Sequence, residues 1–483
     1  MTEVPRTRER WKREFGEWYR SVLLEAEIAD FRHPVKGCGA LLPYGFRLRQ
    51  NVLSIIRRLL DETGHQEVLF PQLIPEDALA KEAEHIKGFS GEVFWVTQGG
   101  ERPLGIRLAL RPTSEAVITP MVAMRARSHR HLPVKYYQVV NIFRFETKMT
   151  VPLIRDREVL TFKEAHTFHA THEEAERQIE EAISIYKRFF DELGIPYLIS
   201  QRPEWDKFAG ALRTISFDTI MPDGRTLQIA TVHDLGQNFA RAFEATFEKP
   251  DGTHEYYWQT SYGISGRVIA ALIAIHGDDI GPCLPPTVAP IQAVIVPIPK
   301  KEFPQNRLLD YVRVLEERLR SKGVRVQSDL REDLTPGAKY YWWDRRGVPL
   351  RLDVGPREVE TNTVVVVRRD TGARETVALE RVVAELERMM QKMQAGLRAR
   401  AWAFLREYVH QPRSLEELRS LIAERRGVAE VPWCGDPDCG QELEEYSEAK
   451  LLGIALDREF ETEQPCLVCG RPTRKVARIA KRY

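Results

Sequence analysis

The sequence lacks any long apolar run, and its first residues, MTEVPRTRERWKREF, are charged throughout. A helix that spans a membrane needs about 20 mostly apolar residues, and a secretory signal needs an apolar segment near the N-terminus. We therefore expect a protein without a membrane span that works in the cytoplasm.

The sequence also lacks a surplus of charge. Its 71 lysine and arginine residues almost balance 70 aspartate and glutamate residues, which leaves a net charge of +1. This balance excludes a global field that attracts nucleic acid, so any such binding must come from local patches. Cysteine is scarce too, and six cysteines in 483 residues exclude a disulfide scaffold.

What is present is enough apolar material, 43% of all residues, for several cores. Helix-like and strand-like segments come in blocks over residues 1–284, which favours an α+β domain with an antiparallel sheet. Six prolines between Gly281 and Pro299 mark a boundary. Strands and helices then alternate over 287–395, which predicts a small α/β domain with a mixed or parallel sheet. A last block covers 400–483.

The stretch FRFETKMTVPLIRDREVLTFKEAHTF, residues 143–168, predicts a hairpin with a basic loop. Alternation along a strand places Ile142, Arg144 and Glu146 on one face. Charge on a buried face is normally avoided or paired. The pattern therefore fits either an edge hairpin with solvated charges or the floor of a site that holds an anion beneath Arg155 and its basic neighbours.

Two further segments carry related signals. LRPTSE places Thr113 and Glu115 where a predicted strand enters a helix, and TSYGISGRVIAALI places small residues before Arg267 and an apolar helix. Glycine lets a ligand approach the backbone closely. The start of a helix is a poor place for a cation but a good one for a phosphate, so Arg267 is interpreted as a phosphate ligand.

Four cysteines gather near the C-terminus, in WCGDPDCG and CLVCG. Their pairwise spacing on glycine-bearing turns suits a tetrahedral zinc ion bound by Cys434, Cys439, Cys466 and Cys469. All four ligand positions would be filled by thiolate, so we expect a structural ion.

Together and in this order, the motifs resemble those of class II aminoacyl-tRNA synthetases. EVLFPQLI resembles the first motif, a dimer-interface strand; FRFE…FKE resembles the second and GISGR the third. RPTSE and TVHDLGQNFA make the chain similar to prolyl-tRNA synthetases of the archaeal/eukaryotic type, in subclass IIa. The resemblance covers nearly the whole chain. The segment between Thr167 and Thr260 leaves no room for the editing domain that the bacterial type inserts there.

This resemblance implies three domains: a class II catalytic domain (1–284), an anticodon-binding α/β domain (287–395) and a small zinc-binding α+β domain (400–483). It implies a homodimer that activates L-proline with ATP to prolyl-adenylate and transfers it to the 3′ end of tRNA(Pro). In adenylate formation a carboxylate attacks the α-phosphorus of ATP. Two anions must be brought together, so positioning and electrostatics should dominate.

The resemblance also implies the roles of individual residues. Arg144 would hold the α-phosphate and the carboxylate of proline, and Arg144 and Arg267 are the catalytic candidates. Residues expected to bind ATP are Arg144, Glu146, Arg155, Phe162, Gln228, Thr231 and Arg267. Residues expected to bind proline are Thr113, Glu115, Arg144, His166, Phe208, His233, Ser261 and Gly263. Magnesium is expected to accompany ATP, with Glu164 and Gln228 as candidate ligands.

For the anticodon the candidates are Arg331, Lys339, Arg357 and Glu358. The C-terminal Tyr483 is expected, by the same resemblance, to dock beside the proline pocket. The alternatives are another subclass IIa synthetase (threonyl-, seryl- or glycyl-) or a non-catalytic tRNA-binding paralogue. Such paralogues typically lose the motif arginines, whereas Arg144, Arg155 and Arg267 are all present.

Overall fold

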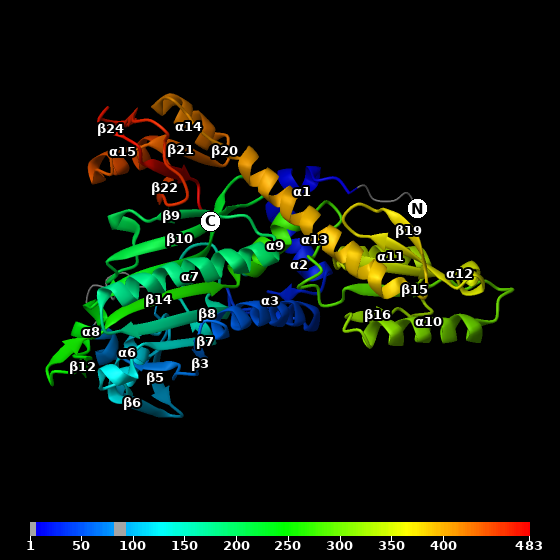
Figure 1. Ribbon diagram of the computed structural model, residues 1–483, viewed down its shortest axis with the longest axis horizontal. Coiled ribbons are helices and arrows are strands. Elements are labelled where there is room, and N and C mark those ends of the chain that lie inside the picture. Colours follow the sequence, from blue (N-terminus) through cyan, green and yellow to red (C-terminus); the bar gives the residue numbers. More distant parts are fainter. Residues whose placement is uncertain (1–5, 82–92) are drawn as a thin grey trace.

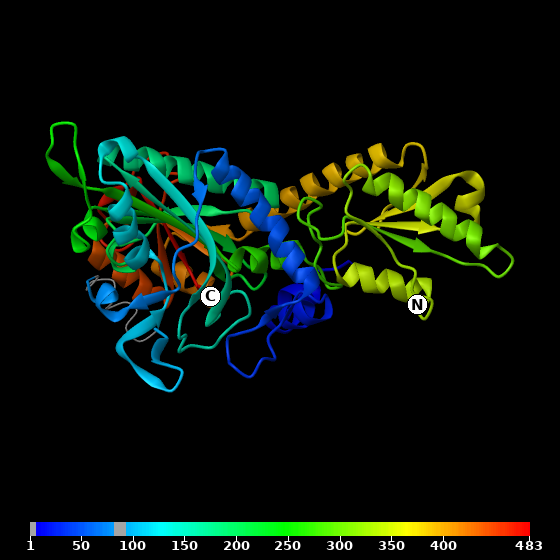
Figure 2. The ribbon, with the colours of Figure 1, turned by 90° about the horizontal axis from the view of Figure 1, so that it is seen from below.

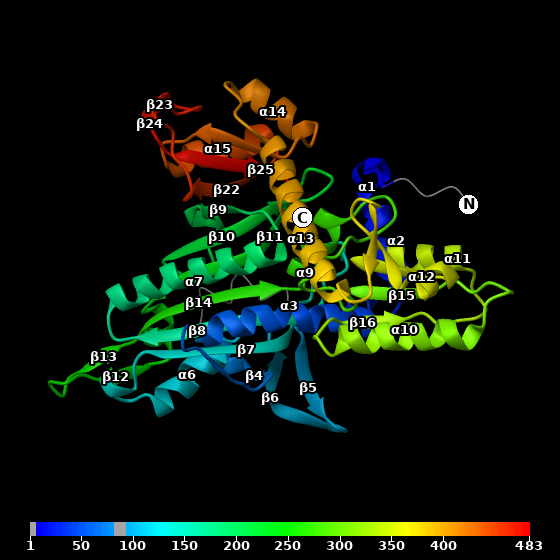
Figure 3. The same ribbon diagram turned by 45° about the vertical axis from the view of Figure 1, so that its right-hand side comes forward.

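The computed structural model of the protein describes residues 6–81 and 93–483. It has a large lobe built on a broad sheet and a smaller lobe beside it (Figure 1), and the two are well separated in the view of Figure 2. Helix α13 (Val382–Glu407) runs from the smaller lobe to the larger one (Figure 3). No helix within the described ranges is both long and apolar enough to cross a membrane.

The central sheet has eleven strands and confirms the predicted antiparallel architecture. All neighbours run antiparallel except the outermost pairs β20–β21 and β3–β7, which are parallel. From one edge to the other the strands are β20 (Val409–His410), β21 (Val428–Pro432), β25 (Val476–Ala480), β22 (Lys450–Ala455), β9 (Leu198–Gln201), β10 (Arg213–Ile220), β11 (Thr226–Gly236), β14 (Trp258–Ser265), β8 (Glu158–His169), β7 (Val134–Phe143) and β3 (Gln66–Glu67).

Apolar helices cover one face of this sheet and form the main core. They are α2 (Phe15–Glu25), α3 (Pro43–Asp61), α7 (His172–Leu193) and α9 (Arg267–His276). Helix α7 begins where the Thr171 side chain accepts a hydrogen bond from the Glu174 amide, and it ends at Gly194 with a left-handed φ of 69°. The Lys163 ammonium from β8 donates to the Tyr186 hydroxyl of α7 on this face. Since strand side chains alternate, Phe162, Glu164 and His166 point to the opposite face.

Shorter elements surround this core. A three-stranded sheet has the order β4–β6–β5, and β12 pairs with β13. The bounds are α1 (Glu9–Arg13), β1 (Ala29–Asp30), β2 (Ala40–Leu41), β4 (Leu73–Pro75), α4 (Glu76–Ala80), β5 (Trp95–Gly99), β6 (Arg102–Leu110), α6 (Glu115–Arg125), η1 (His129–His131), η2 (Glu204–Asp206), α8 (Asn238–Ala242), β12 (Thr246–Glu248) and β13 (His254–Tyr256).

The smaller lobe has a five-stranded mixed sheet, as predicted, in the order β16–β15–β17–β18–β19. Its elements are β15 (Ala293–Pro297), α10 (Gln305–Arg320), β16 (Val326–Ser328), α11 (Pro336–Arg345), β17 (Leu350–Val354), α12 (Pro356–Thr361), β18 (Thr363–Arg368) and β19 (Arg374–Ala378). A buried ion pair ties this lobe to the larger one: Arg369 Nη1 and Nη2 lie 2.6 and 2.7 Å from the two carboxylate oxygens of Asp278.

The C-terminal block continues the central sheet, because β22 pairs with β9. It adds α14 (Leu415–Ala423), α15 (Pro437–Ser447), β23 (Gln464–Pro465) and β24 (Pro472–Thr473). No pattern in the sequence indicates this continuity, since pairing between strands uses backbone groups that all residues share.

One element differs from the sequence-based expectation. Strand β7 ends at Phe143, so Arg144 and Glu146 lie beyond it in the loop rather than on a strand face with Ile142. The ladder between β7 and β8 shifts register between Val140 and Ile142. Beyond that shift the loop closes on itself, because the Arg157 guanidinium donates to the Glu146 carbonyl oxygen at 3.1 Å.

Candidate active site

Three strands of the central sheet bring the candidate residues to one face. The pairing of β11, β14 and β8 aligns His233 with Ser261 and Ser261 with His166. Directly opposed residues in an antiparallel sheet point to the same side. The next row aligns Thr231 with Gly263 and Gly263 with Glu164, and Ser265 lies opposite Phe162. These side chains line a cavity of about 270 Å³.

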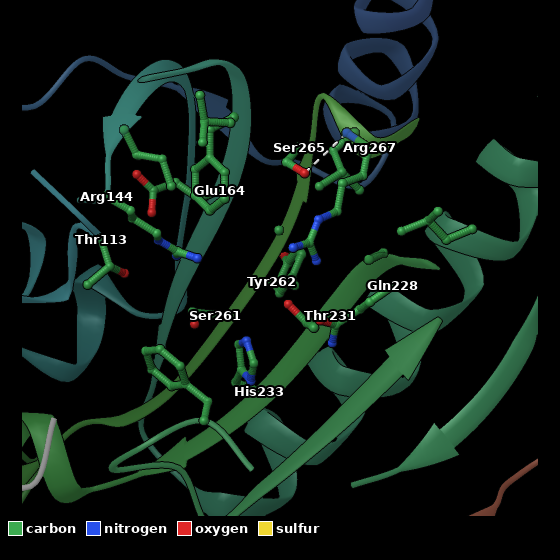
Figure 4. Close-up of a pocket in the computed structure, with 18 of the residues that line it drawn as sticks. Thr113, Arg144, Glu164, Gln228, Thr231, His233, Ser261, Tyr262, Ser265 and Arg267 are labelled. Atoms are coloured by element: carbon green, nitrogen blue, oxygen red, sulfur yellow. Dashed lines mark hydrogen bonds between the residues drawn. The ribbon is translucent and has the colours of Figure 1, made fainter. Parts of the chain in front are cut away.

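The cavity brings together every residue predicted to bind ATP or proline. Its lining contains all fourteen of them: Thr113, Glu115, Arg144, Glu146, Arg155, Phe162, His166, Phe208, Gln228, Thr231, His233, Ser261, Gly263 and Arg267. Arg144 and Arg267 approach it from opposite sides, one from the loop after β7 and the other from the start of α9 (Figure 4).

One end of the cavity is strongly positive. Burial first, and then the charges of Arg144 and Arg155, lower the pKa of Arg267 to about 10. The Arg267 Nε donates to the Ile154 carbonyl oxygen at 2.9 Å, and Arg144 donates to the Pro112 carbonyl oxygen at 3.4 Å. These carbonyl oxygens help to hold the two side chains in place, and the charge of Glu146 offsets part of the repulsion at Arg267. The arrangement fits a polyanion such as a triphosphate.

The other end of the cavity holds buried carboxylates. Thr113 donates to Glu115, and Glu115 Oε1 lies 4.0 Å from His166 Nδ1. Burial alone would lower the pKa of His166, but its hydrogen bond with Glu164 and the charge of Glu115 outweigh burial, so the pKa is raised. A buried carboxylate that keeps an oxygen facing the cavity suits a small cationic group such as an ammonium.

Glu164 does not fit its predicted role as a magnesium ligand. Its Oε1 accepts hydrogen bonds from Ser114 and from Gln138, the latter at 2.8 Å, and its Oε2 lies 3.1 Å from His166 Nε2. Burial alone would raise the pKa of Glu164, yet these hydrogen bonds lower it. Both oxygens are already used to position neighbouring side chains.

An aromatic wall closes the carboxylate end. The rings of Phe208 and His233 lie 4.6 Å apart between centroids, and His233 Nδ1 lies 2.9 Å from the Thr214 hydroxyl. The same hydroxyl accepts a hydrogen bond from the Phe208 amide at 2.9 Å. Thr214 thus joins the loop that carries Phe208 to the strand that carries His233, and the pair forms one side of a compact pocket.

Sequence reasoning missed several residues that line the cavity, among them Asp156, Asp206 and Lys207. Burial raises the pKa of Asp156 to about 8. The position of Asp156 between Arg155 and Arg157 in the sequence could have marked it as a candidate site residue. No local signal indicated Asp206 or Lys207, because they lie at the end of the short η2 turn, which only the tertiary fold brings to the cavity.

The C-terminal tail reaches the site through Arg482 rather than through Tyr483. Tyr483 is not among the lining residues; its hydroxyl donates to Asp223 at 2.9 Å and Arg225 lies over its ring at 3.7 Å. The Arg482 guanidinium pairs with the carboxylate of Asp206, at 2.7 and 3.1 Å. The predicted position of Tyr483 beside the pocket is therefore wrong, because pairing of the tail with the start of β11 at Thr226 holds the ring there.

The four C-terminal cysteines converge as predicted. The four sulfur atoms all lie within 4.8 Å of one another, and Cys434 and Cys469 are 3.8 Å apart. Tetrahedral geometry with Zn–S bonds of ~2.3 Å places sulfurs about 3.8 Å apart, so the cluster could hold zinc. The Arg471 guanidinium donates to Cys469 at 3.2 Å and lowers the pKa of that thiol to about 6. A low pKa favours the thiolate that binds metal, although burial raises the pKa of the Cys434 and Cys439 thiols.

The predicted anticodon residues differ in how accessible they are. Arg331 pairs with Asp329, and Glu358 accepts a hydrogen bond from the Gly355 amide at 2.9 Å. Lys339 is only 5% exposed and donates to the Asp329 carbonyl oxygen at 3.0 Å, which does not fit a contact with a nucleotide base. Arg357 is exposed on α12.

Comparison with known proteins gives matches over nearly the whole chain. Residues 94–276 match the family model "tRNA synthetase class II core domain (G, H, P, S and T)", residues 292–389 match "Anticodon binding domain", and residues 415–483 match "Prolyl-tRNA synthetase, C-terminal". Among curated relatives, "Proline--tRNA ligase" of Sulfurisphaera tokodaii is 53% identical over 480 residues, and that of Metallosphaera sedula is 53% identical over 479; each match covers 99% of both chains.

Two solved structures share the fold. The Giardia lamblia prolyl-tRNA synthetase in complex with prolyl-adenylate is 34% identical with a TM-score of 0.94, and the match covers 99% of each chain. The Cryptosporidium parvum prolyl-tRNA synthetase complexed with halofuginone and AMPPNP is 32% identical with a TM-score of 0.93, over 98% of each chain.

Proposed function

Because this chain belongs to the prolyl-tRNA synthetase family, we propose that it is a proline–tRNA ligase. It activates L-proline with ATP to prolyl-adenylate, releasing diphosphate, and transfers the prolyl group to the 3′ end of tRNA(Pro), releasing AMP. The observation that carries the proposal is the cavity itself: Arg144 and Arg267 enter it from opposite sides (Figure 4), and the buried Glu115 is part of its lining.

The two ends of the cavity account for the two substrates. Arg144, Arg155 and Arg267 hold the phosphates of ATP, with Phe162 stacked on adenine and Glu146, Gln228 and Thr231 completing its site. Arg144 and Arg267 stabilise the charge that moves onto the diphosphate as the proline carboxylate attacks the α-phosphorus. The bond to the α-phosphorus forms as the bond to the diphosphate oxygen breaks, so no covalent enzyme intermediate is needed.

Proline binds at the carboxylate end. Thr113 and Glu115 accept hydrogen bonds from its secondary ammonium, while His166, Phe208, His233, Ser261 and Gly263 surround the ring. Seryl-, threonyl- and glycyl-specific enzymes and a non-catalytic paralogue are not favoured, because the relatives that match over the whole chain are proline–tRNA ligases and the three arginines are in place.

The proposal is tested by ATP–pyrophosphate exchange with each amino acid in turn. We expect exchange that depends on proline and on magnesium and does not require tRNA. Arg144→Ala should lower it at least ~100-fold, as for loss of a charge partner in the transition state, with the fold intact. Exchange at the wild-type rate in a folded Arg144→Ala protein would sink the assignment, as would a stronger response to serine, threonine or glycine.

We propose that magnesium enters with ATP, held mainly by phosphate oxygens and with Gln228 in reach, and that zinc occupies the four cysteines.

The segment between Thr167 and Thr260 folds into α7, α8 and strands β9–β13, so we propose that no editing occurs in cis. Stable alanyl-tRNA(Pro) after incubation with the enzyme supports this, and rapid deacylation contradicts it.

The remaining partners are tRNA(Pro) and a second copy of the chain, in the cytoplasm. For the anticodon, Arg357 is the most accessible of the candidates, with Glu358 next to it in α12, and Arg331 is a further candidate in the loop after β16. Leu69 in the first motif is 82% exposed and Met124 on α6 is 66% exposed. Leu69 lines a hollow with Met121. We propose that a second copy of the chain covers this apolar face in a homodimer. If the Leu69→Asp variant sediments as a monomer, the proposal is supported; if it sediments as an unchanged dimer, the proposal is contradicted.

A further inference from the structure

Beyond the proline pocket, at the far end of β11, three potential metal ligands converge. His172 and Glu176 are four residues apart on α7 and therefore lie on one face of that helix. Asp234 on β11 approaches the same face. One ligand atom from each of the three residues lies within 4.8 Å of the others. We propose that His172, Glu176 and Asp234 form a second metal site, for a divalent transition-metal ion that accepts nitrogen and oxygen ligands.

The distances fit such an ion. His172 Nε2 lies 3.2 Å from Glu176 Oε1 and 3.5 Å from Asp234 Oδ2. Ligands that bind one metal at about 2.1 Å with tetrahedral angles lie about 3.4 Å apart. The imidazole excludes Mg²⁺ and Ca²⁺ as preferred ions, since those bind oxygen, and selects Zn²⁺ and its neighbours.

The hydrogen bonds leave the ligand atoms available. His172 Nε2 is buried, yet it makes no hydrogen bond despite two carboxylate oxygens nearby. Asp234 Oδ1 accepts from the Gly236 amide at 2.9 Å, so Oδ2 is the oxygen that faces His172. In the same way Arg213 binds Glu176 Oε2, which leaves Oε1 for the ion. Each carboxylate is thus oriented by its outer oxygen, as outer-shell partners orient metal ligands.

The site lies at the edge of the fold, with partly exposed side chains around buried ligand atoms. The Trp258 ring packs against the His172 ring at 4.5 Å and limits its rotation. The His172 side chain is 43% exposed and that of Glu176 35%, whereas Asp234 is 3% exposed. Arg213 donates to Glu176 Oε2, and its Nε lies 3.7 Å from Asp234 Oδ2, so it offsets part of the charge of both carboxylates and the ion would offset the rest. Three protein ligands leave a further coordination position for water.

Cobalt titration of the full-length enzyme tests the proposal. Co²⁺ bound by thiolates gives intense charge-transfer bands, whereas Co²⁺ bound by imidazole and carboxylates gives only weak d–d bands, so the two sites are distinguished by spectrum. We expect one equivalent with the weak spectrum. His172→Ala and Glu176→Gln should weaken its binding at least tenfold. Glu173→Gln, which changes an exposed carboxylate in the same turn of α7, should leave it unchanged.

Two results would overturn the site. One is a wild-type titration that shows only the thiolate spectrum, which would mean that Arg213 and His172 simply neutralise the two carboxylates. The other is a weak-spectrum equivalent that persists in a folded His172→Ala protein. Proline-dependent exchange measured on the same samples reports on the proposed function separately, since none of the three ligands lines the cavity.

Discussion

Replacing Arg267 by methionine separates what this arginine does for the fold from what it does for ATP. Arg267 is partly buried near Arg144 and Arg155, and its side chain donates only to the Ile154 carbonyl oxygen among the hydrogen bonds described. Methionine has a similar length and no charge. The substitution therefore removes a repelled cation while it keeps the side-chain volume.

The expected effect on stability follows from the pKa. A folded-state pKa of about 10, against an ordinary value of 12.5, means that the charged form is disfavoured in the folded state by roughly 3 kcal/mol. The penalty applies fully below pH 10 and disappears as the pH rises further. Water in the open cavity screens the repulsion, and the lost hydrogen bond costs about 1 kcal/mol. We therefore expect Arg267→Met to be as stable as the wild type without ligand, or more stable by about 1–2 kcal/mol.

With a triphosphate present, the wild type should become more stable than Arg267→Met. Thermal melts with and without AMPPNP measure this, because a ligand at 100 times its Kd stabilises the folded state by about 2.7 kcal/mol. We expect that shift in the wild type and little of it in Arg267→Met, together with a loss of exchange of at least ~100-fold. Arg241→Met, which removes an exposed arginine from α8, is the matched control. A variant that melts well below the wild type without ligand, or that AMPPNP stabilises normally, refutes the reasoning.

Three further outcomes are expected. Cys466→Ser should bind less zinc by metal analysis and melt at a lower temperature with only secondary kinetic loss; freshly purified wild-type protein without zinc would contradict the site. Arg482→Met frees Asp206 and should raise KM for proline several-fold with little change in Tm, whereas an unchanged KM would show that the tail does not act on the pocket. The raised pKa of His166 means that its imidazolium persists above the usual range and opposes the ammonium of proline. KM for proline should therefore fall as the pH rises through that titration, and a flat pH profile contradicts this.

How well the sequence predicts the site depends on how far apart in the chain the contacting residues are. The face shared by Phe162, Glu164 and His166 follows from alternation along one strand. Which of these residues lies opposite Ser261, and which residue lies opposite His233, depends on the pairing register between strands. Alternation within a single strand does not fix that register. The convergence of the four cysteines was predicted because their spacing in the sequence is typical of a tetrahedral metal site.

Long-range contacts had no local signal. The pair between Arg482 and Asp206 joins residues 276 positions apart, and nothing near either residue indicates the other. Lys339 shows a related limit: the resemblance made it a candidate for contact with the anticodon, whereas the fold buries it against Asp329. Burial of a charge is decided by tertiary packing, so composition around a residue does not predict it.

The same reasoning explains why the basic residues lie at the ends of elements rather than within the sheet. Arg144 follows β7, Arg155 lies in the loop before β8, and Arg267 begins α9. Like charges on adjacent strands would repel directly across the ladder, and at element ends the backbone carbonyls of Pro112 and Ile154 are available to hold them. Glu146 and Asp218 offset part of the repulsion at Arg267, and a bound phosphate would offset more of it. We therefore expect ATP binding to stabilise the loop that carries Arg144 and Arg155 and the start of α9, where the carboxylate of proline must be brought to the α-phosphorus.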